Sequence, residues 1–507
     1  MNDAENGKTG KSIKLMTLIM MIFTTIFGFA NTPIAFMQMG YASIIWYIFA
    51  AIFFFLPLGF MMAEYGSAFN EAKGGIYSWI EGAVGPKIAF IGTFMWLASW
   101  ETWLVATASK IWIPFSTFIS GSDQTQTWHL WGLHSNQVIG VLAVLLIIVV
   151  TFFASKGIDW ISKISSFGGI MMVTINILFF VFSIFILLKN GFHTAEPIHG
   201  LSTFLHSANP SFTSPIAMLS FVVYAVFAYA GMESMGGITD SMENPKRDFP
   251  RGVLISTAII AVLYAISIFL WGASANWSQI IDQGHVNLGN VTYVMMNNLG
   301  STFGNQIGLN AAGAATMGEW FARFAGFDMF IVYIGSFFVL IYSPIKAFVL
   351  GTPKDFWPKH VTELNSAGMP ANAMWYQAIF VIILIFAIAF GGSTAQVFYN
   401  ILTLMGNVST ALPYLFLVGA YPFFNQNPKI EKPYVFFKNK TMMWIVTAIS
   451  FIVLALSVLF TCVEPILEHQ WTDAFWTVSG PVFFTLIAVI LYRRYERKKR
   501  NERKNNA

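Results

Sequence analysis

Two glutamates stand inside long apolar stretches, and these are the residues best placed to do chemistry. Glu101 is flanked by Trp100 and Trp103, and Glu233 follows Gly231 by two positions. An ionisable side chain at membrane depth is costly, so it marks a functional site by default. Such a carboxyl can hold and release a proton or select a cation. We therefore predict a proton-coupling or selectivity role for Glu101 and Glu233. The alternative for Glu233 is a structural acid hydrogen-bonded to neighbouring backbone, and the alternative for Glu101 is a pair with another helix that serves only packing.

Lys110 is the basic residue nearest to Glu101 in the same stretch. It follows Glu101 by nine positions. Successive residues of an α-helix are about 100° apart, so nine positions bring Lys110 to the opposite side of the helix. A direct pair between Glu101 and Lys110 within one helix is therefore not expected.

Other chemistry has little support in the sequence. A lone cysteine, Cys462, excludes a disulfide framework within the chain. The histidines have no metal-site spacing, and the run Gly7-Lys8-Thr9 lacks the earlier glycine of a phosphate loop. No nucleophile–base constellation is visible. We predict a protein that is not an enzyme, with no cofactor, no metal and no nucleic-acid partner.

The elements that carry these residues are predicted to be membrane-spanning helices. The 507-residue chain is 56% hydrophobic and only 10% charged, too few charges for a soluble surface. Apolar stretches of roughly 20 residues suit helices rather than the alternating strands of a barrel. We predict an all-α integral membrane protein with about twelve crossings. They centre on 15–38, 43–63, 89–117, 137–154, 164–188, 214–238, 253–272, 324–345, 373–391, 395–420, 442–462 and 474–492.

Lysine and arginine set the predicted orientation. Of the 28 basic residues, all but Lys110, Lys189 and Arg323 fall at the two termini or in alternate loops. Basic loops remain in the cytoplasm. We therefore predict a multi-pass protein of the cell membrane with both termini cytoplasmic. The basic tail is interpreted as an anchor against anionic lipid rather than a nucleic-acid site.

Two of the predicted helices carry residues that interrupt a helix. The first contains Gly28, Asn31 and Pro33, which predict unwinding near 26–31. The sixth contains Gly231 and a later glycine pair, with Glu233 between them. Paired interruptions in the first and sixth helices are typical of transporters built from inverted repeats. The alternative is that these glycines only permit close helix packing.

Several motifs, in order along the chain, resemble those of the amino acid–polyamine–organocation superfamily. They are Ala63-Glu64, Gly74-Gly75-Ile76-Tyr77, Gly85-Pro86, the stretch 227–233, the stretch 243–251, Tyr342-Ser-Pro-Ile-Lys346, Gly351-Thr-Pro-Lys354 and Gly368-Met-Pro370. More closely, the chain is similar to the glutamate/γ-aminobutyrate antiporter family, in a less characterised permease branch.

The resemblance implies a LeuT-like fold of two inverted five-helix repeats and two peripheral helices. The implied parts are a cytoplasmic tail at 1–12, a first repeat at 13–190, a second repeat at 191–425, peripheral helices at 426–492 and a basic tail at 493–507.

The resemblance also implies a substrate site between the two interrupted helices. Backbone N–H groups of the first interruption would bind a carboxylate, and carbonyls of the sixth helix would bind an ammonium. Phe227 stands where the superfamily has an aromatic lid, and Phe29 and Tyr229 could contribute to it. Many members have Gly-Ser-Gly where this chain has Ile26-Phe27-Gly28, so Phe27 narrows the expected pocket. The predicted substrate-binding residues are Phe27, Gly28, Phe29, Ala30, Asn31, Trp103, Phe227, Ala228, Tyr229 and Gly231.

The function implied is secondary active transport of amino acids by alternating access. The coupling mechanism can be either antiport or proton coupling. Glutamate/γ-aminobutyrate exchange is one form that the antiport would take. The expected partners are an amino acid, protons and the lipid bilayer; the identity of the amino acid and the oligomeric state are not predicted. The alternative is a non-transporting nutrient sensor or assembly partner that keeps an amino-acid pocket.

Overall fold

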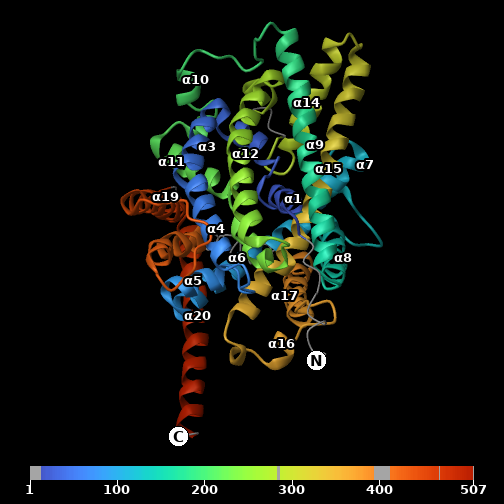
Figure 1. Ribbon diagram of the computed structural model, residues 1–507. Helices are drawn as coiled ribbons and strands as arrows, with labels where there is room; N and C mark the ends of the chain where they lie inside the picture. Colours follow the sequence, from blue (N-terminus) through green and yellow to red (C-terminus); the bar gives the residue numbers. More distant parts are fainter. Residues whose placement is uncertain (1–12, 282–285, 393–410, 468, 506–507) are drawn as a thin grey trace.

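Helices make up the fold of the computed structural model, which describes residues 13–281, 286–392, 411–467 and 469–505 (Figure 1). Within these ranges the regular elements are helical, so the prediction of an all-α protein is confirmed. The α-helices are α1 Leu15–Ile26, α2 Asn31–Met39, α3 Ser43–Ala50, α4 Leu56–Ala68, α5 Ile76–Val84, α6 Pro86–Lys110, α7 Trp112–Ser120, α8 Ser135–Ala154, α9 Ile158–Lys189, α10 Ser202–Leu205, α11 Pro215–Ala228, α12 Pro245–Ser274, α13 Trp277–Ile280, α14 Val291–Gln306, α15 Ala311–Gly351, α16 Lys359–Thr362, α17 Ala371–Phe390, α19 Lys440–Leu467 and α20 Trp471–Asn505. Shorter elements are η1 Gly40–Ala42, the π-helical η2 Ala51–Phe55, η3 Thr125–Thr127, η4 Pro210–Phe212, η5 Met232–Ser241 and η6 Lys354–Phe356.

Ten segments of the described residues are long and apolar enough to cross a membrane. The first, Leu15–Ala68, has 54 residues, which is enough for two crossings at about 20 residues each. Each predicted crossing that lies wholly on described residues overlaps one of these segments. The predicted crossing at 395–420 lies largely outside the described residues; its remainder belongs to a helix over 411–426.

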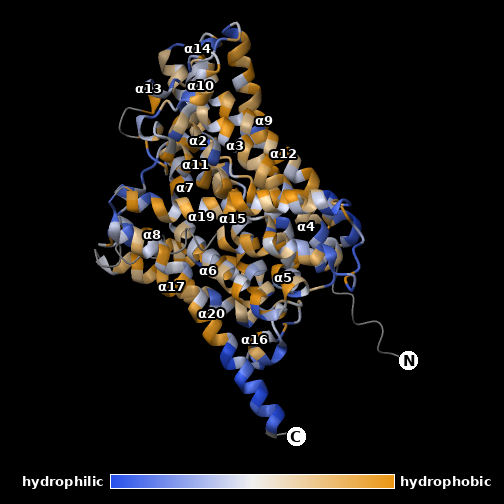
Figure 2. Ribbon diagram, turned by 90° about the vertical axis from the view of Figure 1, so that its left-hand side faces the viewer, coloured by the Kyte–Doolittle hydropathy of each residue, from blue (hydrophilic) through white to orange (hydrophobic). Residues whose placement is uncertain are grey.

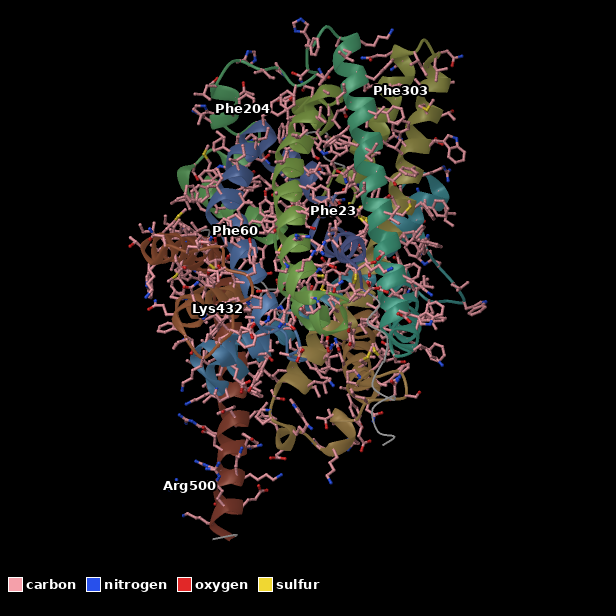
Figure 3. All side chains as sticks on the ribbon, in the orientation of Figure 1. Phe23, Phe60, Phe204, Phe303, Lys432 and Arg500 are labelled. Carbon is pink, nitrogen blue, oxygen red and sulfur yellow. The ribbon has the colours of Figure 1, made fainter. Side chains whose placement is uncertain are left out.

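Both ends of the bundle carry hydrophilic residues (Figure 2). The last turns of α20 project beyond the other helices and are hydrophilic, as Figure 2 shows. Arg500 stands on this projection, away from the side chains that fill the bundle (Figure 3). Helices α10 and α14 lie at the opposite end of the molecule (Figure 1). The long apolar helices therefore run between two polar ends, as a multi-pass membrane protein requires.

A helical hairpin at one end was not predicted from the sequence. Apolar residues predict a crossing over 324–345, but α15 starts at Ala311 and pairs with α14. Small residues allow this close approach: a Cβ on Gly304 would lie 2.9 Å from Cα of Ala314, and one on Gly318 would lie 2.2 Å from Oγ of Ser301. Hydropathy misses the hairpin because its contacts depend on side-chain size rather than on apolar length.

The loop that precedes α5 packs tightly on η5 and fixes the position of η5. A Cβ on Gly75 would lie 2.8 Å from the carbonyl carbon of Gly236, and Gly75 has a φ of +48°. From α15, Nζ of Lys346 donates to the Gly237 carbonyl at 2.9 Å and to Oδ1 of Asp240 at 2.6 Å. The double glycine Gly74-Gly75 is therefore needed for close backbone packing. The motif that ends in Lys346 supplies the ion pair with Asp240 of η5.

Glu64 anchors the segment that leads into α19. Its side chain is fully buried. Oε1 accepts hydrogen bonds from the backbone N–H groups of Phe436 at 2.6 Å and Phe437 at 3.0 Å, and Oε2 accepts one from Nδ2 of Asn425 at 3.2 Å. One buried carboxylate thus accepts hydrogen bonds from two segments far along the chain.

Glu64→Ala is expected to lower the free energy of unfolding by about 1–3 kcal/mol, because the buried N–H of Phe437 and the partly buried N–H of Phe436 lose their acceptor. Thermal unfolding of the purified protein in detergent measures this loss. Glu64→Gln keeps an acceptor oxygen and should lose less. Glu71→Ala, which removes an exposed acid nearby, is the control. An equal effect of the two alanine variants would contradict the anchoring role.

Candidate functional site

The first interruption lies between α1 and α2. Helix α1 ends at Ile26, and Phe27 has an extended backbone with φ −77° and ψ 100°. Helix α2 begins at Asn31. A Cβ on Gly28 would lie 2.7 Å from Nδ2 of Asn31, so only glycine fits there without a shift of Asn31. The predicted unwinding near 26–31 is confirmed.

The second interruption follows α11. This helix ends at Ala228, and Gly231 adopts a left-handed conformation with φ +119° before η5 begins at Met232. Residues with side chains rarely adopt that conformation, so the glycine permits the change of direction. The predicted interruption of the sixth helix is confirmed as well.

A tyrosine from α12 joins the two interruptions. The hydroxyl of Tyr264 donates to the Ala228 carbonyl at 2.8 Å. The same oxygen accepts from the Gly28 N–H at 3.0 Å and from Nδ2 of Asn31 at 3.1 Å. Tyr264 is fully buried. Sequence analysis missed this residue; the only signal was a tyrosine in the middle of an apolar helix, where its hydroxyl needs a partner.

Tyr264→Phe is expected to reduce transport at least about tenfold, because two backbone groups at the interruptions lose a partner worth about 1–3 kcal/mol. The measurement is the initial rate of solute exchange in proteoliposomes. Tyr376→Phe removes an exposed hydroxyl from α17 and is the matched control. If Tyr264→Phe transports at the rate of the control, the bridge between the interruptions is not needed.

A cavity of about 360 Å³ lies beside both interruptions. Of the predicted site residues, those that line it are Phe27, Gly28, Ala30, Asn31, Trp103, Phe227 and Ala228. Polar side chains from α6 and α15, among them Thr107 and Tyr333, complete the wall. The volume falls within the range of small-molecule sites. The backbone groups that meet at Tyr264 therefore lie at the edge of a cavity that suits a small solute.

Three predicted site residues lie behind the interruptions instead of in the cavity wall. Phe29 is fully buried, with its ring centroid 5.7 Å from that of Trp271. Tyr229 stacks on Phe55 at 4.4 Å. The N–H of Gly231 donates to the hydroxyl of Tyr414 at 2.8 Å. Because the backbone turns at each interruption, neighbouring residues point to different sides, and a lid role for Phe29 or Tyr229 has no geometric support.

The comparisons with known proteins assign the family. A model of the amino acid permease family matches residues 13–490. The chain belongs to the amino acid permease family.

Relatives of this permease cover nearly its whole length. The inner membrane transporter YjeM of Salmonella typhimurium is 49% identical over 488 residues, 96% of this chain and 97% of the relative. The aspartate/glutamate permease AcaP of Lactococcus lactis is 23% identical over 96% of this chain and 97% of the relative. A glutamate/gamma-aminobutyrate antiporter of Lactococcus lactis is 20% identical over 88% of this chain and 82% of the relative.

Glu233 of the permease lies in a buried hydrogen-bond network outside the cavity wall. It is 1% exposed. Oε1 accepts from Nε1 of Trp96 at 2.9 Å, and Oε2 accepts from the Tyr414 hydroxyl at 2.6 Å and from the Gly231 N–H at 3.2 Å. The carboxyl therefore connects α6, the second interruption and the helix over 411–426. This geometry favours the structural alternative, in which Glu233 positions the interruption.

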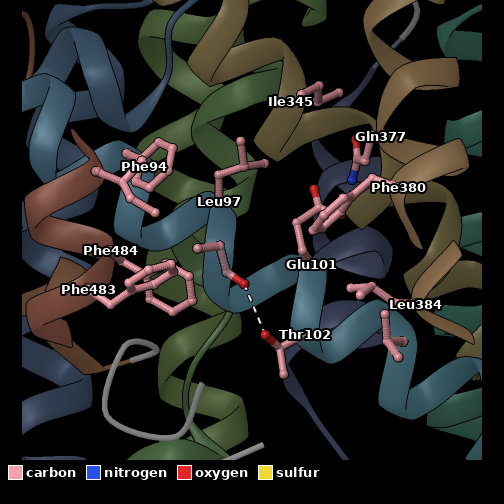
Figure 4. Close-up of a pocket in the computed structure, with 13 residues that line it drawn as sticks. Phe94, Leu97, Glu101, Thr102, Ile345, Gln377, Phe380, Leu384, Phe483 and Phe484 are labelled. Atoms are coloured by element: carbon pink, nitrogen blue, oxygen red, sulfur yellow. Dashed lines mark hydrogen bonds between the residues drawn. The ribbon is translucent and has the colours of Figure 1, made fainter. Parts of the chain in front are cut away.

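Glu101 lies on the side of α6 away from the cavity at the interruptions. It lines a second cavity, with Leu97 and Thr102 on the same helix (Figure 4). Trp103 and Lys110 line the first cavity from the other side of α6. The predicted separation of Glu101 from Lys110 is therefore seen, and α6 is the wall between the two cavities. A direct contact of Glu101 with a substrate in the first cavity is not supported.

Lys110 supplies the charge of the first cavity. Among the described residues of its wall, Lys110 carries the one charged side chain. The residue is exposed and closes α6 at its C-terminal end. Lys110 was not among the predicted site residues, because the sequence does not show which face of α6 meets the interruptions. A cationic wall without an opposing acid favours an anionic solute.

Proposed function

We propose that this permease is a secondary active transporter of acidic amino acids. The supporting observation is one cavity that joins Gly28, Ala228 and Lys110. The α-carboxylate would bind at the first interruption beside Gly28 and the ammonium at the second beside Ala228, while the Tyr264 hydroxyl holds the two interruptions at the spacing that the substrate spans. Lys110 would then bind the side-chain carboxylate. A charged hydrogen bond in a partly dry cavity supplies both affinity and selectivity.

The remaining site residues have roles that follow from their positions. Phe27, Trp103 and Phe227 would pack against the apolar part of the substrate, while Ala30 and Asn31 complete the wall. Phe29, Tyr229 and Gly231 would hold the interruptions from behind. Glu233 would set the geometry of the second interruption, and Glu101 would act from outside the cavity if it takes part in proton coupling.

Alternating access completes the proposal. The permease would work in the cell membrane as two five-helix repeats over 13–190 and 191–425, with 426–492 at the periphery. Both termini, including 1–12 and 493–507, would lie in the cytoplasm, as the basic loops indicate. Energy would come from exchange or from protons, and no bond of the substrate is broken, so the protein would not be an enzyme.

The experiment is counterflow in proteoliposomes. Vesicles are preloaded in turn with glutamate, aspartate, γ-aminobutyrate, leucine or arginine, and the same solute in labelled form is added outside at pH 5.5 and 7.5. Accumulation of label with internal glutamate or aspartate supports the proposal, and uptake driven by a pH gradient alone would indicate proton coupling. Counterflow with leucine or arginine but not with the acidic amino acids would refute the substrate class. No counterflow by folded protein would favour a sensor.

A further inference from the structure

The second cavity lies beside α6 and is almost entirely apolar. It has a volume of about 460 Å³. The lining residues are Phe94, Leu97, Ala98, Glu101, Thr102, Val105, Ile345, Gln377, Phe380, Leu384, Phe483, Phe484 and Ile487, from α6, α15, α17 and α20. In Figure 4, Phe483 and Phe484 face Phe380 and Leu384 across this space. A space of this size would hold a small hydrophobic molecule.

Two buried polar side chains in this cavity have atoms that pair with none of the residues that the structure describes. Glu101 is 9% exposed, and its Oε2 is buried with no hydrogen bond to a described residue. Gln377 is 5% exposed, and both polar atoms of its amide are unpaired. Buried polar atoms without partners are destabilising, so such atoms in one cavity point to a ligand that pairs them.

The cavity is reached from the side of the bundle. Phe380 on α17 is 52% exposed and Phe483 on α20 is 51% exposed. Both helices are long and apolar enough to cross the membrane, so these rings face the hydrocarbon of the bilayer. A ligand that enters between them comes from the lipid and must itself be largely apolar.

Charge complementarity selects the polar end of that ligand. Glu101 is the one ionisable side chain among the described residues of this wall. A carboxylate only accepts hydrogen bonds, and a buried acid is stabilised by a cation beside it. A fatty acid would add a like charge, and a plain hydrocarbon would leave the carboxyl unpaired. We propose that this cavity binds a hydrophobic primary amine, with the ammonium between Glu101 and Gln377 and the alkyl chain between α17 and α20.

The site is independent of the proposed acidic substrate. The two cavities contact opposite faces of α6, so an amine in the second cavity need not compete for Gly28 or Lys110. Its binding is therefore tested directly, by a readout that does not require transport.

The test is photolabelling of the full-length permease in nanodiscs. The probes are a twelve-carbon amine, the matched alcohol and the matched carboxylic acid, each with a diazirine in the chain, and the labelled peptides are mapped by mass spectrometry. We expect the amine to label residues of α6, α17 or α20 that line the cavity. Glu101→Gln should lower amine labelling about tenfold, the loss of one charge-assisted hydrogen bond, while alcohol labelling changes little.

Asp328→Asn is the matched control. Asp328 is another buried acid, and both of its oxygens are unpaired among the described residues, but it lies on α15 outside this cavity, and its replacement should leave amine labelling unchanged. Equal labelling by the three probes would identify a lipid-chain groove and overturn the proposal. Amine labelling that survives Glu101→Gln would also overturn it. Ala98→Phe, which fills the cavity, should abolish labelling; if Glu101→Gln does not fold, persistent amine labelling of Ala98→Phe at the same peptides refutes the site.

Discussion

Glu233→Ala is expected to cause the largest loss of stability of any change at the site. The variant leaves the Trp96 indole N–H, the Tyr414 hydroxyl and the Gly231 N–H without their carboxylate. The Gly231 N–H keeps the Tyr414 hydroxyl oxygen as an acceptor, but the Trp96 N–H and the Tyr414 O–H lose theirs and a cavity remains. At about 1–3 kcal/mol for each unsatisfied group, the free energy of unfolding should fall by about 3 kcal/mol or more. Thermal unfolding in detergent and counterflow in proteoliposomes measure the effect.

Glu233→Gln separates structure from proton coupling. Glutamine keeps an acceptor for the Trp96 indole but cannot carry a carboxyl proton. If Glu233 only positions the interruption, the glutamine variant should fold and keep most of its exchange activity at both pH 5.5 and 7.5. If the variant folds but loses uptake driven by a pH gradient, Glu233 carries the proton. Wild-type stability of Glu233→Ala would contradict the network itself.

Lys110→Gln is expected to cause the largest change in selectivity. The proposed contact of Lys110 with a side-chain carboxylate is a charged hydrogen bond, and its loss should raise the apparent KM for glutamate about tenfold or more. A neutral amino acid has no second carboxylate, so any weak exchange of leucine should not fall. Concentration series of counterflow with both solutes give the two constants.

Two control variants accompany this prediction, one that keeps the positive charge at position 110 and one that removes a lysine elsewhere. Lys110→Arg keeps the positive charge and should lose less than Lys110→Gln. Lys189→Gln removes an exposed lysine at the end of α9, away from the described wall of the first cavity, and should leave the apparent KM unchanged. Because exposed charges also attract anions from a distance, the comparison is made at high salt, where such steering is screened. An unchanged KM for glutamate in Lys110→Gln would refute the acidic-substrate proposal.

The sequence by itself determined the class of protein and the places where its helices break. Long apolar segments fix the crossings because hydrophobic burial in lipid depends on local length and composition. The interruptions followed from Gly28 and Gly231 because glycine and proline act on the backbone where they stand. The separation of Glu101 from Lys110 on α6 also followed from helix geometry alone.

Only the tertiary structure decided which residues meet. Tyr264 joins the two interruptions from α12, Glu64 binds backbone groups of a loop far along the chain, and the hairpin of α14 with α15 depends on small residues in two separate segments. The structure also placed Lys110 in one cavity and Glu101 in another, and turned Phe29 and Tyr229 away from the first. These facts depend on which helices pack side by side and on how the backbone turns at each break. Composition and local spacing carry no record of either.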